Sequence, residues 1–108
     1  MTESEFNEHA EAALREVELA VDAVDVGIDC SRSGSVLTLE LDNDTKVIVN
    51  TQAAMCQIWV AARSGGFHFG YDSGQWRDTR DGSELFASLS RIISSQSGHP
   101  VVLRPAES

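Results

Sequence analysis

The chain has 108 residues, of which 42% are hydrophobic, and this size and composition predict one folded domain with a single core. Its formal net charge is -9, from 17 acidic and 8 basic residues. This acidity disfavours nucleic acid and anionic membranes as partners, because both attract basic surfaces. Cations and basic protein patches are favoured instead, although acidity can also serve solubility alone.

Targeting and redox signals are sparse. The acidic N-terminus is followed by no apolar run, so it resembles no signal or transit peptide. We find no run long and apolar enough to span a bilayer. Cys30 and Cys56 match no metal or redox spacing, and we expect free thiols in a reducing cytoplasm.

Residues 3–24 are predicted to form an amphipathic helix. Thr2 and Glu5 have the spacing of a capping box at its start. Apolar residues then recur at steps of three and four, which places them on one face. They are Phe6, Ala10, Ala13, Leu14, Val17, Val21 and Val24.

The same helix carries an acidic stripe, about a third of a turn from the apolar one. Its members are Glu11, Glu18, Asp22 and Asp25, with Arg15 interrupting them and Asp29 following in a predicted loop. Like charges four residues apart, as in Glu18 and Asp22, destabilise a helix by a few tenths of a kcal/mol. Acids near the helix C-terminus also oppose the helix dipole. This local conflict indicates a function, the alternative being a merely solvated face.

The next segment reads as a β-hairpin. Residues 36–41 and 46–50 alternate apolar and polar side chains and are separated by the turn signal Asn43-Asp44. A loop of two residues would pair Leu39 with Ile48 on one face. The opposite face would then carry some apolar surface.

Residues 57–62 form the most apolar short run and are predicted to be a strand that ends before Ser64-Gly65-Gly66. Ile58 and Val60 share one face of this strand, and Trp59 lies on the other. If the first two point into the core, the indole lies on the outer face of the sheet. There it either forms part of a contact surface or is half covered by neighbouring side chains.

Residues 67–69 and 75–78 are predicted as two further strands, and apolar spacing from 85 to 93 predicts a second helix. Ser83 is its expected N-cap, and residues 101–103 form a terminal strand or a packed tail. Successive hairpins make an antiparallel sheet, which the two helices can cover on one side. We therefore predict a single α+β domain over residues 1–108. It is a two-layer sandwich whose sheet has at least five strands, with the N- and C-terminal helices packed on one face.

No catalytic constellation is present in the sequence. There is no Ser–His pairing, nucleophile elbow or glycine-rich phosphate loop. His9, His68 and His99 lie in different predicted elements, without a second ligand at zinc spacing. The acidic stripe suits hard cations such as Fe(III), Ca(II), Mg(II) or Mn(II). A convex helix surface cannot enclose an ion, so binding there should be weak and rich in water.

Two motifs in the middle of the chain resemble the frataxin family, specifically its bacterial members. Asn50-Thr51-Gln52 resembles the family's Asn-x-Gln, and Gln57-Ile58-Trp59-Val60 is similar to its Gln-(Ile/Val)-Trp-Leu. The glycines, phenylalanines and Trp76 that follow come in the expected order. The resemblance extends over residues 4–104.

The resemblance implies a small cytoplasmic protein that is not an enzyme, binds iron and regulates iron–sulfur cluster assembly. It implies docking on the cysteine desulfurase and scaffold complex, a monomeric state and weak binding of Fe²⁺ or Fe³⁺. Other hard divalent cations should compete, and oligomerisation with iron is left open. Carried over residue by residue, the metal-binding set is Glu18, Asp22, Asp25, Asp29 and Asp42. The partner-binding set is Asn50, Gln52, Gln57 and Trp59.

The chain departs from its bacterial relatives at four positions of interest. Leu19 and Ala23 stand where relatives often carry the second acid of a pair. Thr51 replaces a residue that is often basic, and Cys56 one that is often histidine. Two alternative functions stay open: an acidic interaction module without a metal role, and a ferroxidase, for which a preorganised buried site is missing.

Overall fold

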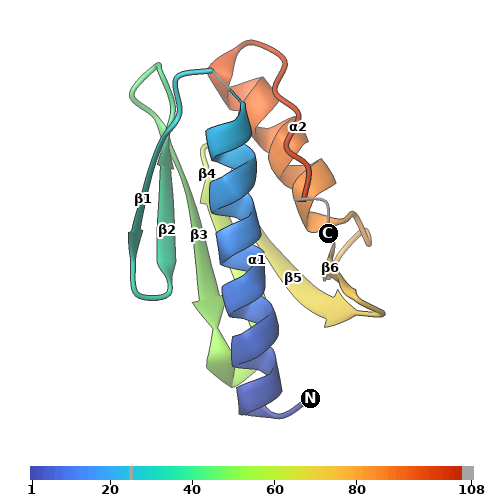
Figure 1. Cartoon of the computed structure of the whole chain (residues 1–108). Helices are drawn as coiled ribbons and strands as arrows, with labels where there is room; N and C mark the ends of the chain where they lie inside the picture. The colour runs from blue at the N-terminus through green and yellow to red at the C-terminus, as the bar shows by residue number, and fades with distance from the viewer. Residues whose placement is uncertain (25, 106–108) are drawn as a thin grey trace.

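The computed structural model describes residues 1–24 and 26–105. Within these ranges the chain forms two α-helices, six strands and one short 3-10 helix (Figure 1). In chain order these elements are α1 (Glu3–Ala23), β1 (Asp29–Ser33), β2 (Val36–Glu40), β3 (Lys46–Gln52), η1 (Ala53–Met55), β4 (Gln57–Ala62), β5 (Gly65–Asp72), β6 (Gln75–Asp78) and α2 (Leu85–Ser97). No helix in the described part of the chain is long and apolar enough to cross a membrane.

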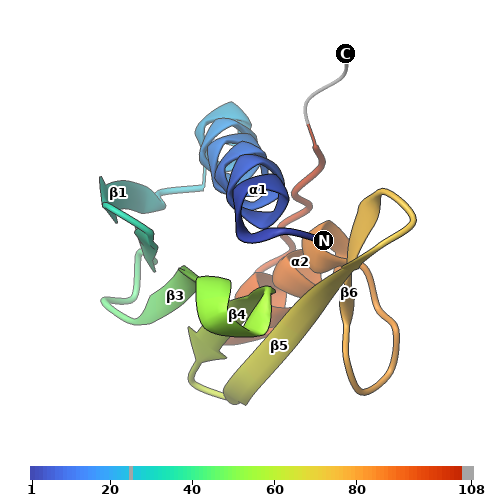
Figure 2. The same ribbon diagram turned by 90° about the horizontal axis from the view of Figure 1, so that it is seen from below.

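The six strands form one antiparallel sheet in the order β1-β2-β3-β4-β5-β6, so each strand pairs with its neighbour in the chain. Both helices lie against the same face, around which the sheet curves (Figure 2). The predicted two-layer α+β sandwich is therefore confirmed. The opposite face of the sheet carries no helix among the described residues.

Helix α1 begins as its sequence predicts. Glu5 donates its backbone N–H to the Thr2 hydroxyl at 3.1 Å, and its carboxylate accepts from the Thr2 backbone at 2.8 Å. The capping of α2 differs from the prediction, because Glu84 rather than Ser83 is the N-cap. The two oxygens of the Glu84 carboxylate accept from the N–H groups of Phe86 and Ala87, which a hydroxyl cannot do as well.

The predicted register of the β2–β3 hairpin is wrong by one residue. Leu39 pairs with Val47, and Ile48 pairs with Thr38. The connection is longer than two residues, since the Leu41 backbone N–H donates to the backbone oxygen of residue 45 at 2.8 Å. This register keeps Leu39 and Val47 together on the buried face and turns Ile48 outward, whereas a one-residue slip would exchange the faces.

The sequence analysis did not predict strand β1 (Asp29–Ser33). Asp29, which was expected in a loop, is its first residue, and its sequence has none of the apolar alternation typical of a strand. β1 is an edge strand, so only one side of its backbone is paired within the sheet. Polar residues are common at such edges because they oppose pairing with other chains.

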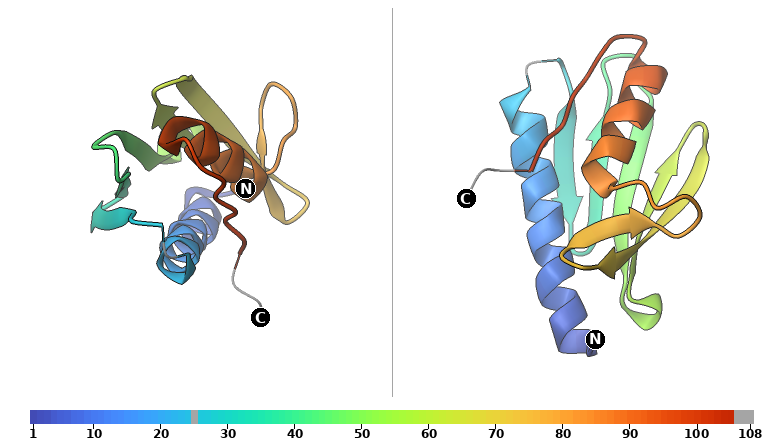
Figure 3. Two further views of the ribbon diagram at one scale, coloured as in Figure 1. Left: turned by 90° about the horizontal axis from the view of Figure 1, so that it is seen from above. Right: turned by 90° about the vertical axis from the view of Figure 1, so that its right-hand side faces the viewer.

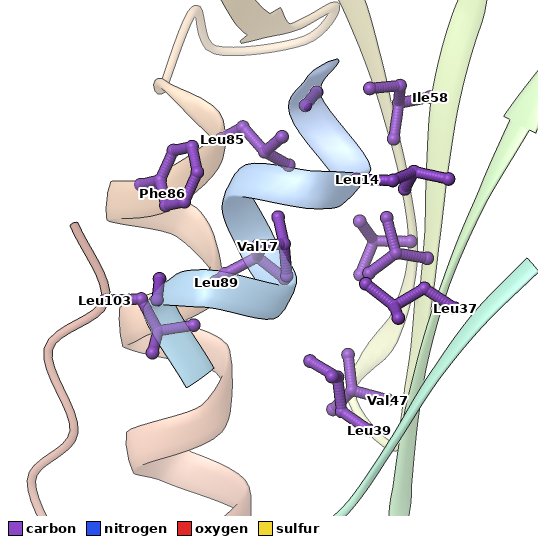
Figure 4. Packing of buried hydrophobic residues seen from close by; sticks show 14 of the residues in the cluster. Leu14, Val17, Leu37, Leu39, Val47, Ile58, Leu85, Phe86, Leu89 and Leu103 are labelled. Carbon is purple, nitrogen blue, oxygen red and sulfur yellow. The ribbon is translucent and has the colours of Figure 1, made fainter. Parts of the chain in front are cut away.

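The core fills the space between the helices and the sheet (Figure 4). Leu14 and Val17 of α1 belong to the same buried cluster as Leu37 and Ile58 of the sheet, and all four side chains are at most 1% exposed. The chain after α2 returns along the helices (Figure 3). Residues 101–103 form no strand, so of the two predicted possibilities, a terminal strand or a packed tail, the structure has the packed tail.

Candidate functional site

A groove separates the C-terminal half of α1 from the start of β1. Glu18 and Asp22 line it from the helix, and Asp29 and Cys30 line it from the strand. Its volume is about 450 Å³. Three of the five residues in the predicted metal-binding set therefore face one feature, which we call the acidic groove.

The remaining two members of the set lie elsewhere. Asp42 precedes β3, and its carboxylate is 3.4 Å from Nε2 of His99. A Cβ built on Gly27 would be only 3.3 Å from that of Asp42, so Asp42 is next to the connection between α1 and β1. It therefore lies beside the chain segment that leads from α1 to Asp29 of the acidic groove. Asp25 lies outside the described residues.

One basic residue that sequence reasoning missed reaches the acidic stripe. Arg32 of β1 donates from Nη1 to Glu18 at 3.1 Å, from Nη2 to Glu11, and from Nε to the Gly34 carbonyl at 3.1 Å. The hydrogen bond to Glu11 is the main cause of a raised pKa for this guanidinium. Two carboxylates of the stripe thus share an internal counter-ion. The sequence did contain one indication of this contact, since Arg32 is a lone basic residue that follows the acidic helix within ten residues.

The donor set suits a loosely held hard cation. The described residues contain no group of three or more His, Cys, Asp or Glu side chains that could hold a metal ion together. Asp22 and Asp29 are exposed on the two rims of the acidic groove. One or two carboxylates with water completing the coordination is the mode that Mg²⁺ adopts in many proteins, and hard iron can bind carboxylates in the same way.

The thiol of Cys30 lies in this negative environment. Although Cys30 as a whole is exposed, partial burial of its thiol, followed by the charges of Glu18 and Asp22, raises its pKa. The thiol therefore stays protonated near neutral pH and is a weak nucleophile and a poor metal ligand there. Both Cys30 and Cys56 are free cysteines in the described structure.

The predicted partner-binding residues form one patch on the helix-free face of the sheet. Asn50 and Gln52 of β3 are paired across the ladder with Trp59 and Gln57 of β4. Gln52 donates to the Asn50 side chain at 3.3 Å, and the Trp59 indole donates to Gln57 at 2.8 Å. We call these four residues, together with His68, the sheet patch.

His68 is the residue of the sheet patch that sequence reasoning missed. It pairs with Trp59 in the β4–β5 ladder, and the two rings stack with centroids 4.4 Å apart and planes 12° apart. Trp59 thus faces outward, as its strand position predicts, and is half covered by its neighbour. The alternation of Phe67, His68 and Phe69 was the signal, since it places the histidine on the outer face.

Comparison with known proteins agrees with this architecture. A family model described as a frataxin-like domain matches residues 1–99, and the chain belongs to this family. The iron–sulfur cluster assembly protein CyaY of Paraburkholderia phytofirmans is 54% identical over 94% of this chain and 96% of its own length. The protein of the same name from a Janthinobacterium species is 53% identical over 98% and 99%.

Solved structures show the same relationship. Frataxin from Psychromonas ingrahamii superposes with a TM-score of 0.87 at 36% identity, over 94% of this chain and 97% of that one. Trimeric frataxin from the yeast Saccharomyces cerevisiae, complexed with ferrous iron, gives a TM-score of 0.66 at 27% identity, over 87% and 86%. The family resemblance of the sequence is therefore confirmed.

Proposed function

We propose that this protein is a non-enzymatic, iron-binding regulator of iron–sulfur cluster assembly. The observation that carries the proposal is the convergence of Glu18, Asp22 and Asp29 on one groove. The chain belongs to a family whose bacterial members are named for cluster assembly and whose yeast member has been solved with ferrous iron.

In this proposal iron is cargo, held at the acidic groove by carboxylate oxygens and water. Glu18, Asp22 and Asp29 make the first contacts, and Asp42 adds negative charge beside the connection between α1 and β1. Asp25, the fifth residue of the predicted set, lies outside the described residues. Hard oxygen ligands do not discriminate strongly among hard cations, so Mg²⁺, Ca²⁺ and Mn²⁺ compete. Exposed carboxylates are screened by salt, so affinity is micromolar or poorer and falls as ionic strength rises.

The sheet patch is the proposed docking surface for the cysteine desulfurase and its scaffold. It combines a half-buried indole with amide side chains that both donate and accept hydrogen bonds. Aromatic residues surrounded by polar groups are typical anchors of protein interfaces. The patch and the acidic groove lie on different elements, so one protein can hold iron and contact its partner at the same time.

An anaerobic Fe²⁺ titration followed by NMR tests the metal role. We expect line broadening confined to the end of α1 and the start of β1. The double variant Asp22→Asn/Asp29→Asn should bind iron at least severalfold more weakly with its fold intact. A matched control, Glu8→Gln/Asp72→Asn, removes the same charge from exposed positions outside the acidic groove and should bind nearly as the unchanged protein does. A single tight site that is insensitive to the first pair would refute the proposal.

One observation favours the second candidate, an acidic interaction module without metal. The described residues offer no three-ligand cluster, and Arg32 already neutralises part of the stripe. This alternative predicts no localised broadening by Fe²⁺, while binding of the desulfurase through the sheet patch persists. The same titration therefore separates the two functions.

A further inference from the structure

Arg32 of β1 forms ion pairs with two glutamates of α1. β1 has a single neighbour in the sheet, and four of its five residues are exposed. The Arg32 side chain is 24% exposed, and all three of its nitrogen atoms donate hydrogen bonds. Its partners on the helix, Glu11 and Glu18, are two turns apart on the acidic stripe.

Glu18 belongs to two sites at once. It lines the acidic groove beside Asp22, and its Oε1 atom accepts from Arg32 at 3.1 Å. A cation that approaches this carboxylate meets a positive charge already bound to it. The two positive groups repel each other, and they compete for the same oxygen atoms.

We propose that Arg32 is a built-in competing cation that sets how strongly the acidic groove binds metal ions. The inference rests on the proposed function, since it names the regulator of that same site. A divalent ion near Glu18 weakens the bond to Arg32, and Arg32 weakens the binding of the ion. By linkage the two effects are equal in free energy, so loading the groove also loosens the attachment of β1 to α1.

The electrostatic part of this effect can be estimated. A +2 ion and a +1 guanidinium roughly 6 Å apart in a solvent-exposed site repel enough to weaken binding on the order of tenfold. The effect should shrink as salt is added, because the ionic atmosphere screens exposed charges. Arg15 lies on the same stripe of α1 and is exposed, but it makes no ion pair with the described residues. It is therefore a matched control for charge without contact.

The test measures Mn²⁺ affinity by electron paramagnetic resonance at low salt, for the unchanged protein, Arg32→Gln and Arg15→Gln. We expect Arg32→Gln to bind on the order of tenfold more tightly and Arg15→Gln to gain about threefold or less. Asp22→Asn, added to each variant, should weaken the binding severalfold. NMR spectra of Arg32→Gln show whether its fold is kept.

A measurement on the unchanged protein needs no variant. Saturating Mg²⁺ should shift the Arg32 Nε–H signal and speed hydrogen exchange of the β1 amides that pair with β2. If Arg32→Gln gains no more than Arg15→Gln and the Nε–H signal does not move, the inference is overturned while the proposed function stands. If binding in every protein is insensitive to Asp22→Asn, both are overturned.

Discussion

Replacing each of the two tryptophans by alanine should have very different effects on stability. Trp76 is 7% exposed and packs edge-on against Phe6 and Tyr71, with ring centroids 5.8 and 5.0 Å away. Trp59 lies on the helix-free face of the sheet and stacks on His68. The same substitution therefore compares a core tryptophan with a surface tryptophan in one domain.

The structure gives the expected magnitudes. Trp76→Ala opens a cavity in the core and should cost roughly 3–5 kcal/mol. Trp59→Ala loses one aromatic stack, worth roughly 0.5–1.5 kcal/mol, and part of its apolar contact area, for a total of about 1–2 kcal/mol. In a domain of this size about 1 kcal/mol lowers Tm by roughly 4–8 °C.

Urea unfolding followed by circular dichroism measures both costs, with Tm as a second readout. Binding of the desulfurase should rank the two variants in the opposite order. Trp59→Ala should lose about 2 kcal/mol, or roughly thirtyfold in Kd, if it is an interface anchor. If Trp59→Ala is as destabilising as Trp76→Ala, its placement outside the core is wrong. If it is folded but binds the desulfurase normally, it is not an anchor.

Two further predictions concern the tail and the thiol. Ser94 exchanges two hydrogen bonds with the Val101 backbone, at 2.8 and 2.9 Å, so Ser94→Ala should cost about 1–2 kcal/mol in thermal unfolding, while exposed Ser95→Ala changes little. If Ser94→Ala is silent, these bonds do not hold the tail. Cys30 should react with iodoacetamide more slowly than a model thiol at pH 8, because its pKa is raised, and Asp22→Asn should speed the reaction. Equal reaction rates for Cys30 and the model thiol would contradict the raised pKa. Because the pKa of Cys30 is higher in the folded than in the unfolded protein, its contribution to folding stability is present below the unfolded pKa and is lost as pH rises through the folded pKa.

Local sequence patterns predicted correctly where α1 begins and which side chains of β4 face the core. The capping box at Thr2 marked the start of α1, and alternation in β4 placed Ile58 inside and Trp59 outside. The predicted register of the β2–β3 hairpin was wrong because the turn signal Asn43-Asp44 indicated a loop of only two residues. The pairing is instead decided by the burial of Leu39 and Val47 on the same face.

The candidate site was only partly readable from sequence for a related reason. Carboxylate spacing on α1 identified Glu18 and Asp22, because helical periodicity is local. The bond from Arg32 to Glu18 spans 14 residues of chain and depends on where β1 lies against the helix. β1 itself carries no apolar alternation, so neither the strand nor its contact could be predicted.

The proposed role in cluster assembly is tested most directly by the rate of cluster formation in a reconstituted assay. The assay contains the cysteine desulfurase, the scaffold, cysteine and Fe²⁺, with or without this protein. We expect the protein to change the rate, Trp59→Ala to abolish the change, and Asp22→Asn/Asp29→Asn to alter its dependence on iron. An unchanged rate with the folded protein, or an effect that survives all three substitutions, would contradict this role.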